Sequence, residues 1–426
     1  MDKALPKLYL IMDNYPFGDE ESSFIAPEIP LLLEKFDVTI LSLSVSDKLT
    51  NDVDERIKLY HFDRKAPVVM KLLDSLSYFI NPVCKREHRE VKQDKELKKT
   101  RLFDSLFFYN DAKRFKRFIK KNGIIDPSEK AIVYSYWYSF GTYAALSLFG
   151  KNDNIKVISR CHRCDLYDEG WEGQRQPFKH YMNSLIDRII FIAEHGRKYF
   201  IDRYGDECEG LKGKCLLYRL GVEREFPLCG EKADDSVFTI ASCARVSERK
   251  RVDLIAKALG LITKDELGSV KKVRWVHFGD GPAFDPLKEL AKEKLDDKPY
   301  IEYEFMGNVK PEKITAYYSE NPIDLFVTTS ASEGCPVSVQ EALAYGIPVI
   351  GTDVADIPYM IDGNGILISE NPSPEEVRDS ILKIMDSDKT STERMKTRSE
   401  EIWNENFNAQ KNHSRYASFL RELVGE

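Results

Sequence analysis

The sequence predicts an α/β protein of two domains, each built on a parallel β-sheet that helices cover on both faces. Its 426 residues exceed what one hydrophobic core usually supports. Short apolar runs rich in branched residues alternate with longer segments of helical periodicity. Continuous apolar strands separated by helices are typical of parallel sheets, and such strands occur in two sets along the chain.

The two sets of predicted strands define the domain organisation. The first set covers residues 8–12, 38–42, 58–62, 132–135, 155–159 and 188–192, and the second covers 238–242, 273–278, 301–305, 325–328 and 348–351. Residues 229–235, with Gly230 in a charge cluster, are expected to form the linker. We predict an N-terminal domain over residues 1–229, a C-terminal domain over 230–405, and a helix over 406–426 that packs back on the first domain.

Composition limits the classes of function. The net charge of -7 argues against general nucleic-acid binding. The first apolar run ends at Asp13 and is too short for a secretory signal, so we expect a cytoplasmic protein whose eight cysteines are reduced. Cys161 and Cys164 form a C-x-x-C, which we interpret as two thiols in a turn, with a metal or redox role as the alternative.

One segment departs from the acidic average. Residues 85–123 hold 14 Lys or Arg against 6 Asp or Glu, while Leu106, Tyr109, Ala112, Phe115 and Ile119 recur at helical spacing. One interpretation is a solvated helix on a core. The other is a helix within residues 85–121 that docks on an anionic surface, which would make the protein peripheral at the inner face of the membrane.

The stretch from Ser332 to Ile350 is the most informative part of the sequence. A strand ending near Thr328 is followed by a loop with Glu333 and Gly334, and a helix is expected from about Pro336 to Gly346. Glu341 then lies in the middle of that helix. Gly334 allows close approach of the backbone to a ligand, and the helix start offers free N–H groups to a phosphate.

This stretch, written E-G-x-P-x-x-x-x-E-A-x-x-x-G-x-P-V-I, resembles the E-x7-E signature of family 4 of the retaining glycosyltransferases. The resemblance implies a GT-B fold, in which two Rossmann-like domains with parallel sheets face a central cleft. It implies a nucleotide-sugar donor, UDP- or GDP-linked, and transfer with retention and without a metal or other cofactor. The acceptor would be a glycan or a lipid-linked oligosaccharide, as in polysaccharide biosynthesis.

The same resemblance assigns roles in the second domain. Arg245 and Lys250 would bind the diphosphate and stabilise the departing charge. Glu341 would hold the ribose, and Glu333 would lie against the sugar ring. The segment after Glu333 would line the donor site together with the loop at Gly307, which resembles the loop against the base. That segment comprises Gly334, Cys335, Pro336 and Val337. Residues 279–282 resemble the family's G-D-G-P turn.

The first domain resembles the family less closely. The loop with Gly18 is similar to the family's glycine loop on the acceptor side, although adjacent glycines are common there. His162 is expected to contact the transferred sugar, and Asp165 to hold that histidine or an acceptor hydroxyl. Departures occur at Leu220, where the family often has Asn, and at Ala355, where it often has Gly.

Other classes of function remain as alternatives. A sugar phosphorylase or a nucleotide-sugar epimerase could use the same scaffold, and an inactive nucleotide-sugar-binding subunit is a non-enzymatic alternative. An oxidoreductase would need a G-x-G-x-x-G between a first strand and helix, which neither Gly18 nor Gly279 provides. The two D-x-D patterns, at residues 52–54 and 386–388, are interpreted as chance.

Overall fold

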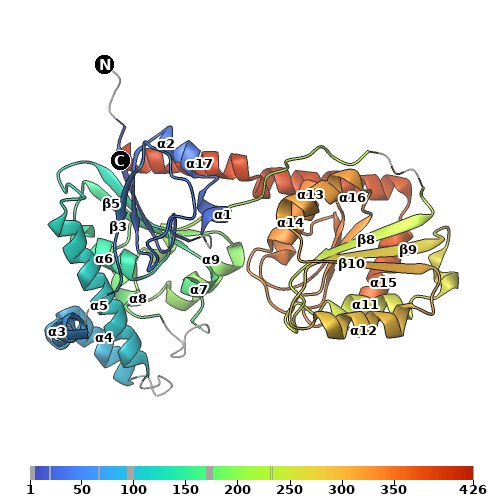
Figure 1. The fold of residues 1–426 in the computed structure, drawn as a ribbon, viewed down its shortest axis with the longest axis horizontal. Coiled ribbons are helices and arrows are strands. Elements are labelled where there is room, and N and C mark those ends of the chain that lie inside the picture. Colours follow the sequence, from blue (N-terminus) through green and yellow to red (C-terminus); the bar gives the residue numbers. More distant parts are fainter. Residues whose placement is uncertain are drawn as a thin grey trace. The chain divides into compact units, whose positions relative to one another are not determined.

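The computed structural model describes residues 5–18, 21–65, 68–93, 100–168, 176–230, 232 and 234–425 (Figure 1). The chain forms two compact units. Unit 1 comprises Met1–Arg219 and His413–Glu426, and unit 2 comprises Leu220–Asn412. The predicted domain boundaries at 229/230 and 405/406 therefore move to 219/220 and 412/413. Residues 231 and 233 of the predicted linker lie outside the described residues.

The earlier start of unit 2 has a local cause. Val222 donates its N–H to the Phe407 carbonyl at 2.8 Å, and its own carbonyl accepts from the Ala409 N–H at 3.2 Å. The Trp403 indole also donates to the Val222 carbonyl. Gly221 has a φ of +90°, and a Cβ there would lie 2.4 Å from the Phe407 carbonyl oxygen. Residues 220–222 are therefore bonded into unit 2, and a glycine is required at 221.

Unit 1 contains a seven-stranded parallel sheet in the order β3-β2-β1-β4-β5-β6-β7. The strands are β1 (Lys7–Met12), β2 (Asp37–Ser42), β3 (Lys58–His61), β4 (Ala131–Ser135), β5 (Ile155–Cys161), β6 (Arg188–Phe191) and β7 (Cys215–Leu217). All six predicted strands are present. The sequence analysis missed β7, because three residues at a sheet edge give too short a pattern.

Helices cover both faces of this sheet, since alternate strand residues pack into different cores. One face is covered by α1 (Ser22–Ile25), α2 (Ile29–Leu33) and the end of α17 (Ala409–Gly425). The helices that contribute to the other core are α3 (Val68–Ile80), α4 (Pro82–Gln93), α5 (Thr100–Lys121), α6 (Phe140–Phe149), α7 (Arg163–Leu166), α8 (Lys179–Leu185), α9 (Glu194–Tyr204) and α10 (Leu211–Lys214).

Unit 2 contains a six-stranded parallel sheet in the order β10-β9-β8-β11-β12-β13. The strands are β8 (Val237–Cys243), β9 (Lys272–Phe278), β10 (Ile301–Gly307), β11 (Leu325–Thr328), β12 (Val349–Thr352) and β13 (Gly365–Ile368). The short edge strand β13 is the one that the sequence analysis missed. Both sheets are doubly wound, as the sequence predicts.

The helices of unit 2 also form two layers. One core receives α11 (Asp253–Leu261), the 3-10 turn η2 (Lys264–Leu267), α12 (Phe284–Leu295), α15 (Pro374–Met385) and part of α16 (Lys389–Ile402). The other receives α13 (Pro311–Glu320), α14 (Val337–Ala344) and the π-helical turn η4 (Trp403–Phe407). The expected start of α14 at Pro336 shifts by one residue, because Pro336 has an extended backbone and caps the helix. Gly346 follows the C-cap with a φ of +68°.

A buried ionic cluster ties the C-terminal helix to unit 1. Arg160 of β5 donates to Glu28 at 2.5 Å and to the Tyr136 hydroxyl at 3.1 Å. His413 of α17 lies 3.3 Å from the same Glu28 oxygen, and the Arg160 guanidinium stacks over Tyr416. Burial opposes ionisation of Glu28, but Arg160 and His413 together outweigh it and lower the pKa of the carboxyl. The end of β5, which precedes His162, is thus fixed from the C-terminal helix.

Helix α5 has the predicted periodicity. Tyr109, Ala112, Phe115 and Ile119 are buried, and Leu106 is half-buried. Residues 94–99 of the predicted basic segment lie outside the described residues. Within the part of the chain that is described, no helix combines the length and apolar character needed to cross a bilayer.

Candidate functional site

The strand orders place a switch point in each sheet. In unit 2 the order reverses between β8 and β11, and in unit 1 between β1 and β4. Ligands of open α/β sheets bind outside the carboxyl ends of the strands at such points. The loops after β8 and β11 carry Arg245, Lys250 and Glu333, and α14 carries Glu341. The sequence-predicted donor residues therefore lie together at the switch point of unit 2.

The Arg251 side chain links the two loops to each other by several hydrogen bonds. Arg251 has a φ of +48°, and its guanidinium donates to the Thr329 carbonyl at 2.7 Å and to the Ser330 carbonyl at 3.0 Å. It also reaches the Glu370 carbonyl and the Asn371 side chain beyond β13. The Thr329 hydroxyl in turn donates to the Arg251 carbonyl at 2.8 Å. The sequence analysis missed Arg251, because its role depends on carbonyls that are 78 to 120 residues away.

The same loops bring a lysine and a carboxylate into contact. Lys250 Nζ lies 2.5 Å from Glu333 Oε1, and both side chains are largely buried. The next carbonyl, that of Gly334, accepts from the Asp356 N–H at 3.2 Å. Glu333 is thereby held by a cation on one side, and the backbone after it is held by the loop that follows β12. This pair supplies both a positive and a negative group at one point of the switch region.

Glu341 lies on the first turns of α14 with its carboxyl almost buried. Only 9% of the residue is exposed, and burial raises the pKa of its carboxyl to about 7. No hydrogen bond or ion pair joins this carboxylate to any other described residue. A buried acceptor without a donor is costly, and such groups are common at binding sites. The side chain thus offers an acceptor for donors that a ligand would bring.

The turn after β9 packs directly on the loop that carries Arg245. Gly279 has a φ of +127°, and a Cβ there would lie 2.1 Å from the Ala244 carbonyl oxygen. A Cβ on Gly281 would lie 2.4 Å from the Val246 carbonyl oxygen. Backbone hydrogen bonds join Val246 to the turn, and Gly279 donates to the Gly307 carbonyl at 2.8 Å. Glycine is required at both positions because of these close approaches, and a Cβ on Gly281 would also lie 3.0 Å from Cγ of the exposed Arg245 side chain.

The remaining predicted donor residues lie around the start of α14. Cys335 accepts from the Gln340 side-chain amide through both its carbonyl and its sulfur, at 3.3 Å each. Pro336 caps the helix, and Val337 is half-exposed on its first turn. This segment leaves the N–H groups of the first turn available for an anionic ligand.

In unit 1, His162 follows β5 at the carboxyl edge of the sheet. Its ring packs against Trp137 and Tyr136, at centroid distances of 4.3 and 5.1 Å. His162 is buried, with 6% of the residue exposed, and neither ring nitrogen has a hydrogen-bond partner among the described residues. Burial, aided by the charge of Arg160, lowers the pKa of His162 to about 3. The imidazole is therefore neutral, with one donor and one acceptor to offer.

Asp165 holds the backbone around His162. Its two carboxylate oxygens accept from the N–H groups of His162 and Tyr138, at 2.6 Å each. Burial raises the pKa of Asp165 to about 6, against these hydrogen bonds. Lys179 closes the other end of α7 by donating to the Asp165 carbonyl at 2.9 Å. Asp165 therefore positions His162 through its backbone.

The loop after β1 is organised by a carboxylate that the sequence analysis did not select. Glu21 is fully buried and accepts from the backbone N–H groups of Asp13, Asn14 and Tyr15, while the Trp137 indole also donates to it. Burial, reinforced by the charge of Glu21, raises the pKa of Asp13 to about 7. Gly18 lies on this loop, whereas residues 19 and 20 lie outside the described residues. In the sequence, the only signal for Glu21 is that a carboxylate residue occurs in the segment after a predicted strand.

The C-x-x-C pair does not have the character of a redox site. The thiols of Cys161 and Cys164 are both free. Burial raises the pKa of both thiols, that of Cys164 to about 11, and a raised pKa disfavours the reactive thiolate.

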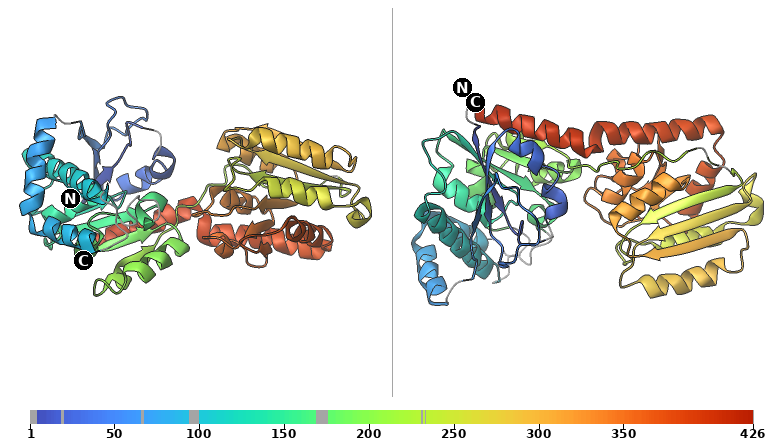
Figure 2. Two further views of the ribbon diagram at one scale, coloured as in Figure 1. Left: turned by 90° about the horizontal axis from the view of Figure 1, so that it is seen from below. Right: turned by 45° about the horizontal axis from the view of Figure 1, so that its top comes forward.

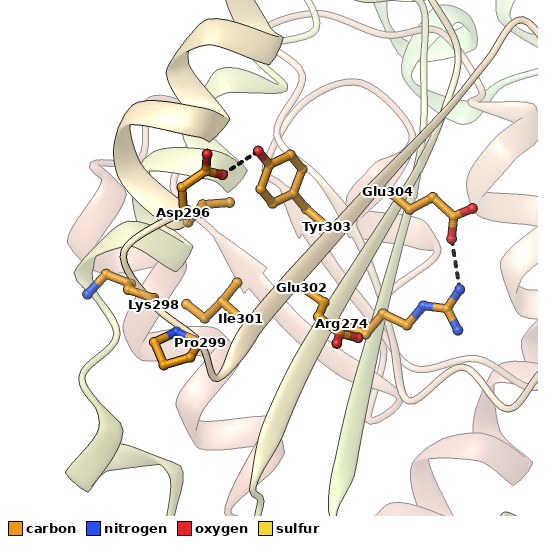
Figure 3. Close-up of a pocket in the computed structure, with 9 residues that line it drawn as sticks. Arg274, Asp296, Lys298, Pro299, Ile301, Glu302, Tyr303 and Glu304 are labelled. Atoms are coloured by element: carbon orange, nitrogen blue, oxygen red, sulfur yellow. Dashed lines mark hydrogen bonds and ion pairs between the residues drawn. The ribbon is translucent and has the colours of Figure 1, made fainter.

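A cavity of about 580 Å³ lies at the other end of the unit 2 sheet (Figure 3). Its walls come from the end of α12 and the first half of β10, where Tyr303 donates to Asp296 and Arg274 pairs with Glu304. Gly307, which belongs to the predicted site, ends the same strand at the carboxyl edge. The cavity is therefore remote from the switch point.

The role of Arg251 can be tested with a charge-conserving substitution. Arg251→Lys keeps the charge but cannot reach the same set of carbonyls, and each charge-assisted hydrogen bond contributes about 1.5–3 kcal/mol. We expect a lower free energy of unfolding and a nucleotide affinity reduced about tenfold, measured by calorimetry well below the unfolding temperature. Arg249→Lys is the matched control, because the exposed Arg249 side chain makes one hydrogen bond to the described residues, to the Ser332 carbonyl. Equal affinities in both variants would contradict the proposed role.

Comparison with known proteins finds a family match within unit 2. Residues 230–401 match the family model described as glycosyl transferases group 1. Over 137 residues the chain is 33% identical to the alpha-monoglucosyldiacylglycerol synthase of Streptococcus pneumoniae, a stretch covering 32% of this chain and 26% of the synthase. The chain thus spans about a quarter of that relative.

Solved structures resemble the chain over nearly its whole length. A lipopolysaccharide outer core galactosyltransferase, WaaB, matches with a TM-score of 0.66 at 14% identity, over 97% of this chain and 99% of that one. The Anabaena protein HepE in complex with UDP-glucose matches with a TM-score of 0.57 at 13% identity, again over 97% and 99% of the two chains. The predicted fold class is confirmed: the chain has the GT-B fold of glycosyltransferases, and its residues 230–401 carry the match to the group 1 family.

Proposed function

We propose that the protein is a retaining, metal-independent glycosyltransferase of family 4. It would move a sugar from a UDP- or GDP-linked donor to a glycan or lipid-linked oligosaccharide. The observation that carries the proposal is the cluster at the unit 2 switch point. There a lysine–glutamate pair, an exposed arginine, a helix start and a buried carboxylate without a partner lie on adjoining loops.

The cations suit the leaving group. A departing nucleoside diphosphate gains negative charge, and fixed positive groups stabilise that charge more in the transition state than before it. Arg245 is exposed next to the glycine turn after β9, and Lys250 follows it on the same loop. The N–H groups at the start of α14 add to the positive potential. On this proposal the two side chains do the work that a divalent ion does in other transferases.

The two glutamates suit the neutral parts of the donor. Glu341 would accept hydrogen bonds from the ribose hydroxyls, because its carboxylate has no donor from the described chain. Glu333 would accept from a sugar hydroxyl while Lys250 holds its other side. Neither residue is proposed as a nucleophile; the departing phosphate would instead help to deprotonate the acceptor on the same face, so that the anomeric configuration is kept.

His162 would contact the transferred sugar from unit 1. Its neutral ring presents two unsatisfied nitrogens, and Trp137 and Tyr136 fix the ring plane. The relatives support the acceptor class: one is a synthase of a glucosylated diacylglycerol, and one solved structure is a lipopolysaccharide core galactosyltransferase. Both names describe the addition of a sugar to a lipid or to a lipid-linked glycan.

The proposal is tested by a donor screen. We expect binding, seen as a thermal shift, for one nucleotide class and its sugars, and slow hydrolysis of the correct donor without acceptor. A donor at 100 times its dissociation constant stabilises by about 2.7 kcal/mol. Hydrolysis should persist in excess EDTA, and NMR should show an α-product from an α-linked donor. Loss of activity in EDTA that manganese restores would refute metal independence, and a β-product would refute retention.

Substitutions of Glu341 and Glu333 should have different effects on nucleotide affinity and on sugar transfer. Glu341→Gln loses a charged acceptor worth about 1.5–3 kcal/mol, so affinities for free nucleotide and for nucleotide sugar should both fall by about tenfold or more. Glu333→Gln removes the partner of Lys250 and frees that cation for phosphate, so affinity for the free nucleotide should not fall, while sugar transfer should. Titration calorimetry and turnover measurements separate the two. An equal loss of bare-nucleotide affinity in both variants would show that the roles are assigned wrongly.

Glu341 should also give donor binding a pH dependence. Its pKa in the free protein is about 7, and only the ionised form accepts two hydrogen bonds from a ribose. Below that pKa, donor affinity should fall by up to about tenfold for each pH unit. The titration uses the nucleotide sugar, because a terminal phosphate of the free nucleotide itself titrates near pH 6. Glu341→Gln is the control and should flatten the dependence between pH 6 and 8; an unchanged slope would exclude Glu341 as its source.

A further inference from the structure

Two helices of unit 1, α3 and α5, carry the four most exposed large apolar side chains of the described chain. On α3, Leu76 and Ile80 are 66% and 73% exposed, and Phe79 lies between them at 54%. On α5, Phe103 and Phe107 are also more than half exposed. Figures 1 and 2 show α3, α4 and α5 packed together as one layer of this unit. Exposed apolar groups at this density are unusual for a surface that faces only water.

The exposed apolar end of α3 adjoins a cationic helix. A groove of about 280 Å³ runs between α3 and α4, with Phe79 on one side and Lys85 and Arg89 on the other. Tyr78 and Cys84 form its floor, so that its lining is mainly apolar with the two cations at the rim. Both Lys85 and Arg89 are exposed. We call Leu76, Phe79, Ile80, Lys85 and Arg89 the α3–α4 patch.

The basic side chains of α5, which the sequence would favour for contact with an anionic surface, are instead engaged in contacts within unit 1. Lys113 and Arg117 of α5 both pair with the buried carboxylate of Asp74 on α3. Arg114 donates to the carbonyls of residues 63, 64 and 65 and lies over the Phe62 ring. These side chains fasten α5 to α3 and to the loop after β3. The positive charges of Lys113, Arg114 and Arg117 are therefore engaged in contacts within unit 1. Those of Lys85 and Arg89 are directed to solvent.

Charge and apolarity together identify the partner. Residues 85–123 carry 14 basic against 6 acidic residues in a chain of net charge -7. A polyanion such as a nucleic acid would use the cations but would leave Leu76, Phe79 and Ile80 in water. An anionic bilayer uses both, because apolar side chains enter the acyl region while lysine and arginine stay at the headgroups.

We propose that the α3–α4 patch docks the protein on the surface of an anionic lipid bilayer. Phe79 and Ile80 enter the interface, and Lys85 and Arg89 contact anionic headgroups beside the groove. The surface lies on the helical layer of unit 1 and contains none of the residues assigned to the candidate sites. Docking is therefore independent of donor chemistry, and each proposal can fail without the other.

Vesicle flotation of the full chain tests the proposal. Binding should be strong to vesicles that contain phosphatidylglycerol, weak to pure phosphatidylcholine, and reduced by salt. Phe79→Ser with Ile80→Ser should lower partitioning by about tenfold or more, because two apolar side chains no longer enter the interface. Lys85→Gln with Arg89→Gln should lower it by about tenfold or more on anionic vesicles only.

The matched control removes two charges outside the patch. Lys120→Gln with Lys121→Gln, in the last turn of α5, removes the same number of positive charges. This variant should alter partitioning by less than about twofold. All variants should keep the circular dichroism spectrum and donor hydrolysis of the parent. Equal binding to neutral and anionic vesicles, or unchanged binding of the Phe79/Ile80 variant, would overturn the proposal. So would sedimentation showing that the patch forms a dimer of this chain that the same variant dissolves.

Discussion

The arrangement of the residues at the unit 2 switch point depends strongly on the hydrogen bonds of the Arg251 guanidinium group. Arg251 joins the loop after β8 to the loops after β11 and β13, and its own carbonyl accepts from Thr329. A left-handed backbone at a residue other than glycine costs roughly 1–2 kcal/mol, and these bonds offset that cost. Lys250 directly precedes Arg251 in the chain, and Glu333 follows the loop whose carbonyls Arg251 binds. Their 2.5 Å contact is therefore a consequence of loop geometry rather than a chance meeting of two flexible side chains.

The two switch points have different physical character. At that of unit 2, the exposed Arg245 and the start of α14 adjoin the largely buried side chains of Lys250, Glu333 and Glu341, which suits a charged and polar ligand. At that of unit 1, His162 is neutral and enclosed by aromatic rings, while the carboxylates of Glu21 and Asp165 are occupied by backbone N–H groups. Such a surface suits a ligand that stacks on aromatic rings and forms neutral hydrogen bonds. The contrast fits a division between a nucleotide diphosphate and a glycosyl group.

The sequence predicts this fold well where burial alone determines the pattern. Every predicted strand is present, and β7 and β13 were missed because three or four residues at a sheet edge resemble a loop. The site was predictable where a motif concentrates its groups, as between Glu333 and Glu341. Arg251 and Glu21 were not, because their partners are distant carbonyls or loop N–H groups that leave no periodicity. The same limit applies to the basic segment. Its net charge can be counted in the sequence, but the ion pairs of Lys113 and Arg117 with Asp74 cannot be predicted from it.

The departure at Ala355 can now be interpreted physically. The family often has glycine there, and the residue has a φ of +51°, so this chain keeps the left-handed backbone without the residue that adopts it most easily. The next residue, Asp356, is fully buried, and its N–H donates to the Gly334 carbonyl. That bond holds the loop between Glu333 and α14 in place. The substitution therefore leaves the backbone path intact and changes only the side chains after β12, so that any effect on donor choice would act through what those side chains contact rather than through the geometry of Glu333.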